Sequence, residues 1–379
     1  MLDDAVALRY EAPHSFTGND LVELTLHGSP LLVERVVGAA MELGARMAQP
    51  GEFTERAVLN GKIDLVQAES IADLINSRTA LQASLSLGNM GGLLSRRAAS
   101  IRDALLHVIS RLEAALDFSE EGYEFITRED ARERVVSAIA ETAAIAETYR
   151  RGRATIEGLK AVILGRPNAG KSTLLNRLVG SERAIVTPIP GTTRDIVRES
   201  IEIGGLPVSI ADTAGLRSTG DPVEEIGVAR AREAAAQAEI ILYLVDASSG
   251  LSSEDEIAQY PDAILIYTKI DLRQAPDGAY GISVATEVGI DQLLRRLDQL
   301  VRDRFAAAEG SLVNARQQQA VLACAGALSA ALASIDCGHA EEIIVVDLYR
   351  AATALGLLTG AITNEEIVTE IFTKFCIGK

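Results

Sequence analysis

The apolar residues of this chain follow three different patterns along its length. Residues 1–60 combine short strand-like runs such as LVELTLHG with one helical run, LLVERVVGAAMELG, which is typical of a small α+β unit. From 61 to 157 the apolar residues recur at three- and four-residue spacing, as in ESIADLINSRTALQASLSL, LLSRRAASIRDALLHVISRLEAAL and ARERVVSAIAETAAIAETYR. This spacing predicts long amphipathic helices.

Between residues 158 and 306 the pattern changes to short apolar runs that are rich in β-branched residues. These runs are LKAVILG, ESIEIGG, LPVSIADTAG, EIILYLVD, DAILIYTKID and AYGISVAT. Strands that alternate with helical or loop segments predict an α/β domain with a mainly parallel sheet. Helical patterns return after residue 306, so the simplest organisation is an all-α domain, 61–157 plus 307–379, interrupted by an inserted P-loop α/β domain at 158–306.

Composition places the chain among folded multi-domain proteins. With 379 residues and 48% hydrophobic residues it can bury the cores of two or three domains. No run approaches about 18 consecutive uncharged apolar residues, and the start MLDDAVALRYEAP carries acidic residues where a signal peptide needs basic ones. We therefore expect a cytoplasmic protein with no membrane partner. The cysteines Cys324, Cys337 and Cys376 are too few and scattered for a disulfide framework or a CxxC metal site.

The charge of the chain limits how it can hold a nucleic acid. A formal net charge of −17 repels phosphates at long range, so such a partner requires a local basic patch or a second protein. Two groups of arginines are candidates: Arg96, Arg97 and Arg102 on one predicted helix, and Arg150, Arg151 and Arg153 before a strand. The alternative for each group is a solvated helix face. Nothing in the sequence favours DNA as a partner.

A phosphate-binding loop is the strongest chemical signal in the sequence. VILGRPNAGKSTLLNRL places the pattern GxxxxGK[ST] between a β run and an amphipathic helix, which is the context that this pattern requires. Gly165 and Gly170 let backbone N–H groups surround a phosphate chain, and a helix that starts near Lys171 adds its positive end. Lys171 is expected to reach the β- and γ-phosphates and Ser172 to ligate magnesium.

Two further segments complete the expected phosphate site. In IADTAG, Asp212 can hold the magnesium shell and the Gly215 amide can contact the γ-phosphate, while PGTTRD lies between the two motifs and supplies hydroxyls. Leu216 stands where many small GTPases carry the glutamine that orients water. Another group must then position the water, and Glu224 is a candidate, with a surface charge as the alternative.

AILIYTKIDLRQ is typical of the strand end that reads guanine in G proteins. The two oxygens of Asp271 can accept hydrogen bonds from N1–H and the exocyclic amine of guanine, and the stem of Lys269 can cover a base face. Thr268 stands where such proteins usually carry Asn. The threonine side chain is shorter than that of asparagine, and the loss of one neutral hydrogen bond costs about 1 kcal/mol. Val284, after Ser283, keeps the backbone N–H that the base oxygen needs. We expect GTP to be preferred over ATP, and Asn at position 268 to tighten GDP modestly.

Taken together, these motifs resemble the MnmE (TrmE) family of tRNA-modification GTPases. The similarity is carried by GRPNAGKSTLLN, AIVTPIPGTTRD, DTAGLR, VEEIG and above all the terminal FCIGK. PHSFTGNDLVELTLHG and PGEFTERAVLNGKIDL are similar to the N-terminal tetrahydrofolate-binding and dimerisation domain of that family. The resemblance implies potassium-stimulated GTP hydrolysis by a homodimer that, with the flavoprotein MnmG, takes part in carboxymethylaminomethyl modification at C5 of the wobble uridine of certain tRNAs.

The resemblance also assigns roles to individual positions. The K⁺ ligands would be Asn168, Thr187, Ile189 and Thr192, and the Mg²⁺ ligands Ser172 and Thr193. The GTP-binding positions would be Asn168, Ala169, Gly170, Lys171, Ser172, Thr173, Asp212, Thr213, Ala214, Gly215, Thr268, Lys269, Asp271, Ser283 and Val284. A tetrahydrofolate derivative would be held by Glu23, Lys62 and Lys379. Glu224 would orient water and Lys171 would act on the phosphates, while Cys376 is either a direct participant in modification or a buried structural thiol.

Some features depart from the family pattern. Family members begin some sixty residues earlier, with a segment that includes an arginine at the folate site. Three explanations are open: Met1 is misassigned, the chain is truncated, or folate binding and N-terminal dimerisation are impaired. TKID and Ser283-Val284 replace Asn-Lys-x-Asp and Ser-Ala. Two other hypotheses remain open: a ribosome-assembly or signalling GTPase with added helices, which FCIGK and PGEFTERA disfavour, and a nucleotide-binding scaffold without turnover.

Overall fold

The chain folds into two compact units. The structure, a computed structural model, describes residues 2–118, 125–180, 183–185, 199–212, 232–249, 257–361 and 371–372. The first unit consists of Met1–Asn76, Ser86–Glu147 and Ala315–Lys379, and the second of Ser77–Leu85 and Thr148–Asn314. Each unit is therefore assembled from segments that are far apart in the sequence.

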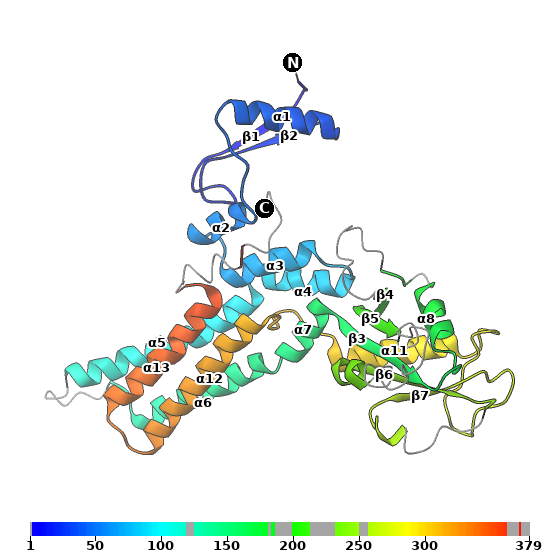
Figure 1. The fold of residues 1–379 in the computed structure, drawn as a ribbon. Coiled ribbons are helices and arrows are strands. Elements are labelled where there is room, and N and C mark those ends of the chain that lie inside the picture. The colour runs from blue at the N-terminus through cyan, green and yellow to red at the C-terminus, as the bar shows by residue number, and fades with distance from the viewer. Residues whose placement is uncertain are drawn as a thin grey trace. The chain divides into compact units, whose positions relative to one another are not determined.

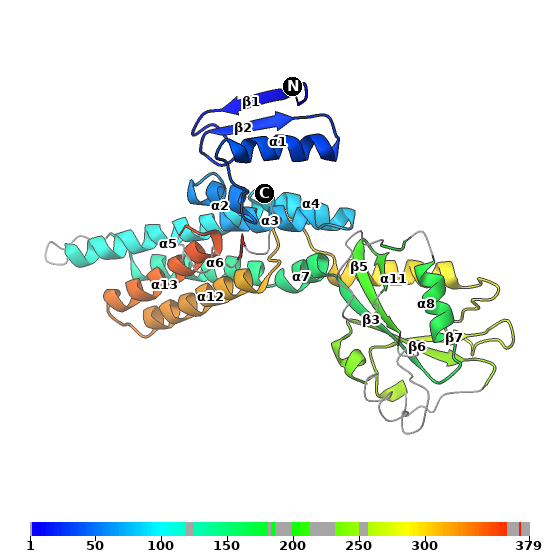
Figure 2. The same ribbon diagram turned by 45° about the horizontal axis from the view of Figure 1, so that its top comes forward.

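The N-terminal part of the first unit contains the predicted mixture of strands and helices. Strands β1 (Val6–Tyr10) and β2 (Leu21–Thr25) form an antiparallel pair in which Leu8 lies opposite Glu23, and α1 (Pro30–Glu42) runs beside them (Figure 2). Proline at the first helical position favours the start of α1 because its fixed φ suits a helix. The helix α2 (Glu52–Leu59) follows.

The rest of the first unit, where the structure describes it, is mainly helical (Figure 1). Its helices are α3 (Leu65–Ile75), the second half of α4 (Ala80–Met90), α5 (Leu93–Asp117), α6 (Arg128–Ala146), α12 (Ala315–Asp336) and α13 (Glu341–Thr359). Four of them, α5, α6, α12 and α13, pack as a bundle in which each helix contacts two neighbours. Leu105, Val135, Leu328 and Leu348, one from each helix, are almost completely buried. Burying each such side chain stabilises the unit by about 1.5–3 kcal/mol.

One helix among the described residues, α12, is long and apolar enough by length and composition to cross a membrane. A core helix of a bundle has the same composition. Val321, Cys324 and Leu328 of α12 are fully buried, and the helix packs against α6 and α13. Burial also raises the pKa of the Cys324 thiol to about 11, in spite of its contact with Thr142, so this cysteine behaves as a packed apolar residue.

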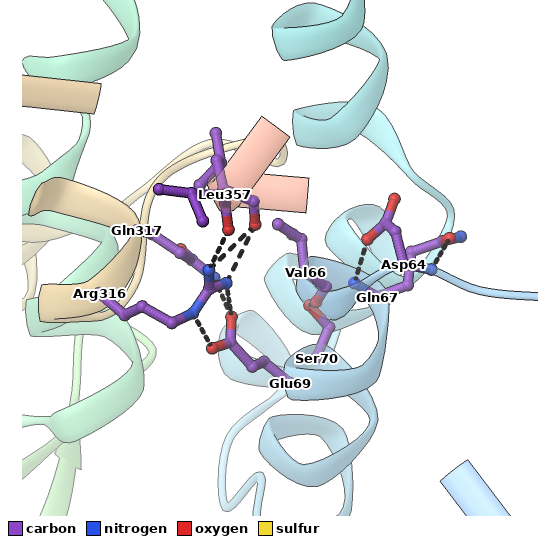
Figure 3. A network of polar contacts seen from close by, with 9 residues as sticks. Asp64, Val66, Gln67, Glu69, Ser70, Arg316, Gln317 and Leu357 are labelled. Atoms are coloured by element: carbon purple, nitrogen blue, oxygen red, sulfur yellow. Dashed lines mark hydrogen bonds and ion pairs between the residues drawn. The ribbon is translucent and has the colours of Figure 1, made fainter. Parts of the chain in front are cut away.

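A fork of hydrogen bonds from Arg316 joins three helices of the first unit (Figure 3). Its guanidinium donates to both carboxylate oxygens of Glu69 on α3 at 2.7 and 2.8 Å, and Gln317 donates to the same carboxylate at 2.8 Å. It also donates to the carbonyl oxygens of Leu357 and Leu358, near the end of α13. These carbonyls belong to the last turn of α13, where no N–H group of the helix is available to donate to them. Arg316 supplies the missing donors.

The second unit contains the predicted α/β domain. Its strands are β3 (Leu159–Gly165), β4 (Glu199–Ile203), β5 (Leu206–Asp212), β6 (Ile240–Asp246) and β7 (Ile264–Thr268), and its helices include α7 (Tyr149–Glu157), α8 (Lys171–Val179) and α11 (Ile290–Phe305). The sheet order is β4-β5-β3-β6-β7, with β4 antiparallel to β5 and the other pairs parallel. The prediction of a mainly parallel sheet is confirmed.

The two faces of this sheet are both covered. Because side chains alternate along a strand, Ile163 of β3 packs with Leu174 of α8 and Leu297 of α11, whereas its neighbours Val162 and Leu164 belong to a second apolar cluster. A strand that is buried on both faces has no polar alternation. This explains why the β runs of the second unit read as continuous apolar stretches.

Two sequence predictions differ from the structure. AYGISVAT was predicted to be β-rich, but it forms only one parallel bridge, between Tyr267 and Gly281, because the chain turns at Ser283, whose hydroxyl accepts from the Thr286 N–H at 3.2 Å. The helical pattern ESIADLINSRTALQASLSL is also broken between α3 and α4. Thr79 and Gln82 cap the start of α4 by accepting from each other's backbone N–H groups, at 3.3 and 3.2 Å.

Candidate functional site

The phosphate-loop pattern lies at the end of β3, where the sequence predicted it. Gly165 ends the strand with φ 139°, and a Cβ atom there would collide with the Leu244 carbonyl on β6. Asn168 and Gly170 adopt left-handed φ values of 63° and 89°, and α8 begins at Lys171. Glycine and asparagine are the residues that tolerate this region most readily. The sequence therefore folds into a tight loop that opens onto a helix N-terminus, which is suited to bind anions.

Lys171 is held inside this loop. Only 8% of its surface is exposed, and its Nζ donates to the carbonyl oxygens of Gly165 and Arg166, both at 2.8 Å. Ser172 and Thr173, the next two residues of α8, are exposed, while Ala169 is buried. The first turn of α8 thus presents an ammonium group and two hydroxyl-bearing residues next to the loop.

The other predicted segments of this site end neighbouring strands. Strand β3 ends at Gly165, β5 at Asp212 and β7 at Thr268. These strands are parallel, and β6 lies between β3 and β7 in the sheet. The carboxyl ends of parallel strands meet at the same edge of a sheet, which is where open α/β sheets bind ligands. The structure describes the backbone of Asp212, which pairs with Ile163.

Thr268 connects the base-reading segment to the phosphate loop. Its side chain is 3% exposed, and its Oγ1 donates to the carbonyl oxygen of Ala169 at 2.8 Å, with the Val245 carbonyl farther away at 3.3 Å. The sequence suggested that threonine would have too short a reach to replace asparagine in full. The hydroxyl nevertheless contacts the loop, because β7 ends directly beside it.

Lys269 is fixed by a residue that the sequence reasoning missed. Its backbone adopts φ 58°, and its Nζ lies 2.6 Å from Oδ2 of Asp246, the last residue of β6. Burial raises the pKa of Asp246, but hydrogen bonds from Lys269 and Ser248 outweigh burial and hold this pKa below its usual value. Asp246 ends the apolar run EIILYLVD, and this single acidic residue at a strand end is the feature of the sequence that could have identified it.

Asp271 and the segment with Ser283 and Val284 lie on adjacent loops. The Ile270 N–H donates to the Ile282 carbonyl at 3.4 Å, which joins the two segments. Asp271 is exposed and lines a pocket of about 450 Å³ with residues of both segments. Ser283 is buried, and its N–H donates to the Val288 carbonyl at 2.9 Å. The structure thus brings Thr268, Lys269, Asp271, Ser283 and Val284 to one region of the second unit.

Two of the residues predicted to bind folate lie in the N-terminal part of the first unit. Glu23 is exposed on β2 and accepts from the Tyr10 hydroxyl at 3.5 Å. Lys62 follows α2, and its Nζ donates to the Pro13 carbonyl at 2.9 Å. Neither hydrogen bond indicates a bound ligand, so folate binding by Glu23 and Lys62 stays a prediction.

The other predicted site residues fall outside the part of the chain that the structure describes. These are Thr187, Ile189, Thr192, Thr193, Thr213, Ala214, Gly215, Glu224, Cys376 and Lys379. Among the described residues, no group of three or more His, Cys, Asp or Glu side chains is arranged to hold a metal ion.

Comparisons with family models and with curated relatives agree with the motifs. Residues 65–376 match the family model "MnmE helical domain", and residues 1–62 match "GTP-binding protein TrmE N-terminus". The "tRNA modification GTPase MnmE" of Symbiobacterium thermophilum is 45% identical over 394 residues, covering 100% of this chain and 86% of the relative. The protein of the same name from Koribacter versatilis is 41% identical over 390 residues, with the same coverage of 100% and 86%. Among solved structures, Era of Aquifex aeolicus bound to GDP.AlF4- matches with 25% identity and a TM-score of 0.30, over 45% of this chain and 66% of that chain.

Proposed function

Since this chain belongs to the MnmE family of tRNA modification GTPases, we propose that its GTP hydrolysis is stimulated by potassium and serves carboxymethylaminomethyl modification at C5 of the wobble uridine of certain tRNAs, together with an MnmG-type flavoprotein. The hydrogen bond from Thr268 to Ala169 carries the nucleotide part of the proposal. It supports a single site in which one ligand meets the phosphate loop and the base-reading segment.

GTP would lie along this edge of the sheet. Asp271 would accept from the guanine edge and Lys171 would contact the β- and γ-phosphates. The exposed hydroxyl of Ser172 on the first turn of α8 is a hard oxygen donor of the kind that Mg²⁺ prefers, with Thr193 as the second protein ligand. Magnesium would neutralise charge on the phosphates when bound.

Potassium would be held beside the phosphate loop. Asn168 is exposed in the loop with a left-handed backbone, and its carboxamide oxygen suits a monovalent hard cation. Thr187, Ile189 and Thr192 would complete the ligand set, and Glu224 would orient the attacking water. A cation at this position stabilises negative charge that develops on the phosphates during hydrolysis.

We assign the exposed apolar face of α1 to contact with a second copy of the chain. Val33, Val37 and Met41 recur every four residues, so they lie on one face of the helix, and they are 45, 39 and 49% exposed. No residue of α1 is buried within the unit. Such an apolar stripe on a surface helix suits a protein interface. The tetrahydrofolate derivative would bind in the same part of the unit, at Glu23 and Lys62 with Lys379.

Hydrolysis in two salts tests the proposal most directly. GTP turnover by the full chain should be faster in KCl than in NaCl at equal ionic strength, and an excess of ATP should not compete. Equal rates in both salts would contradict the potassium site, and no turnover in either would favour a scaffold without activity. Nucleoside analysis of tRNA from a deletion strain tests the pathway: unmodified wobble uridines are expected, and unchanged modification would refute it.

A further inference from the structure

A second pocket, of about 490 Å³, lies within the first unit, whereas the nucleotide site belongs to the second. It is bordered by the segment between α2 and α3, by the N-terminal half of α5 and by the end of α13. The polar residues that line it include Lys62, Gln67, Ser95, Arg96, Arg102 and Thr359. Two of the three arginines that stand out in the sequence of α5 therefore face one cavity.

The lining of this pocket is positively charged although the chain is acidic. Arg96 and Arg102 contribute two positive charges, and Asp64 is the one carboxylate among the lining residues that the structure describes. Lys62 adds a third charge, although its ammonium donates to the Pro13 carbonyl and it is also a proposed folate-binding residue. Asp64 already accepts from the Gln67 N–H at 2.8 Å, where it caps the start of α3. In a chain with a formal net charge of −17, a local excess of cations marks a surface on which an anion can still bind.

Two residues that line the pocket each have a buried polar atom without a hydrogen-bond partner. The Nε of Arg102 and the Oγ of Ser95 are both buried, and neither has a hydrogen-bond partner among the residues that the structure describes. A buried donor that is left unpaired is costly, and a guanidinium remains charged at every physiological pH. Water does not reach either atom, so an anionic ligand in the pocket would pair with them only after the two side chains turn toward it.

We propose that this pocket binds a backbone phosphate of tRNA. Guanidinium groups match the oxygens of a phosphate in a planar fork, and a serine hydroxyl is a common additional donor. Lys62 and Arg96 are exposed, so a phosphate that is tethered in a polynucleotide can reach the pocket from solvent. The proposal rests on the proposed function, because it concerns how an acidic GTPase holds its tRNA substrate.

Arg97 provides a matched control. It lies on α5 beside Arg96 and carries the same charge, but it does not line the pocket. If general electrostatic attraction by α5 explained binding, the loss of Arg97 would be as harmful as the loss of Arg96. If the pocket holds a phosphate, then of these three arginines only Arg96 and Arg102 should affect tRNA binding.

The experiment measures binding of fluorescent tRNA to the full chain over a range of KCl concentrations. We expect Arg96→Gln and Arg102→Gln each to weaken binding about 10-fold. Each should also lower the slope of log affinity against log salt by about one, as expected when one phosphate contact is lost. Arg102→Lys keeps the charge but loses the planar fork of the guanidinium, so it should weaken binding and leave the slope nearly unchanged. Arg97→Gln should behave as the unmodified chain.

Each other outcome overturns the proposal in a distinguishable way. Equal losses in Arg96→Gln and Arg97→Gln would show that the pocket has no special role. Unchanged tRNA binding with weaker binding of a tetrahydrofolate derivative would assign the cations to a small-molecule carboxylate instead. If the unmodified chain bound no tRNA at all, the proposed function would fail together with the pocket. Arg96 is exposed, so Arg96→Gln should leave GTP turnover and the melting temperature unchanged. The Arg96→Gln result therefore tests the proposal even if Arg102→Gln misfolds.

Discussion

The Oγ1 hydroxyl of Thr268 and the carbonyl oxygen of Ala169 lie 2.8 Å apart, and they link the base-reading segment to the phosphate loop. Thr268 ends β7 and Ala169 lies in the loop between β3 and α8, so the bond crosses the edge of the sheet where the four parallel strands end. The bond gives a ligand at one segment a direct physical link to the other.

Removal of this hydroxyl should weaken nucleotide binding. Thr268→Val keeps the shape of the side chain but leaves the Ala169 carbonyl without its donor, which costs about 1 kcal/mol, or roughly a fivefold loss of GDP affinity. Calorimetric titration of the full chain with GDP measures the effect. Thr268→Ser, which retains the hydroxyl, is the control and should bind GDP as the unmodified chain does. Equal affinities for all three proteins would show that the contact does not contribute.

The same contact changes what we expect of Thr268→Asn. The sequence alone predicted that asparagine would tighten GDP, because threonine would not reach the loop. The structure shows that it does, and the side chain is only 3% exposed, with Gly170 close by. We now expect GDP affinity to stay within about threefold of the original. A tenfold gain would mean that the hydroxyl is a poor substitute for the amide.

Gly165 should be intolerant of any side chain. With φ 139° and the Leu244 carbonyl where a Cβ would stand, Gly165→Ala has to move either β6 or the phosphate loop. We expect a lower melting temperature and a loss of nucleotide binding greater than the roughly 1–2 kcal/mol of left-handed strain alone. Gly278→Ala separates the two causes, because Gly278 also has a positive φ, 77°, but meets no atom within 4 Å. Similar effects for both variants would argue against a steric role of Leu244.

The sequence predicted those parts of the fold that local patterns determine. Continuous apolar runs identified β3, β6 and β7, and the phosphate-loop pattern located the start of α8 at Lys171. AYGISVAT has the same apolar character, but a strand also needs length along a neighbour, and the turn at Ser283 prevents it. The sequence gives no sign that Arg316 binds Glu69, because the two are 247 residues apart and only packing brings them together. The same holds for Thr268 and Ala169, which are 99 residues apart.

Asp73 should make the stability of the first unit depend on pH. Burial, and secondly the charge of Glu69 one turn away on α3, raise the pKa of Asp73 from its usual 3.8 to about 7. Between these two values the folded protein retains a proton that the unfolded chain releases, so this group lowers stability as the pH rises from about 4 to about 7. Asp73→Asn stays neutral and should exceed the unmodified chain in melting temperature at pH 8 but not at pH 4.

A control separates Asp73 from the general titration of carboxylates. Asp103→Asn removes an exposed carboxylate of α5, so its melting temperature should follow that of the unmodified chain at every pH. If both variants showed the same difference from pH 4 to pH 8, the pKa of Asp73 would not be raised by its surroundings.

The Arg316–Glu69 pair should stabilise the first unit far more than a surface ion pair of equal length. Its side chains are 20% and 10% exposed, and Arg316→Met would leave the Glu69 carboxylate poorly solvated and the end of α13 without a donor. Removing one partner of such a pair costs about 3 kcal/mol. Arg132 and Asp336, in the same bundle, also lie 2.7 Å apart, but they are 44% and 47% exposed, so Arg132→Met should cost at most about 1 kcal/mol. Urea unfolding followed by helical circular dichroism compares the two. Equal costs would mean that the fork at Arg316 is no stronger than a solvated pair, and that the apolar core alone joins α3 to α12 and α13.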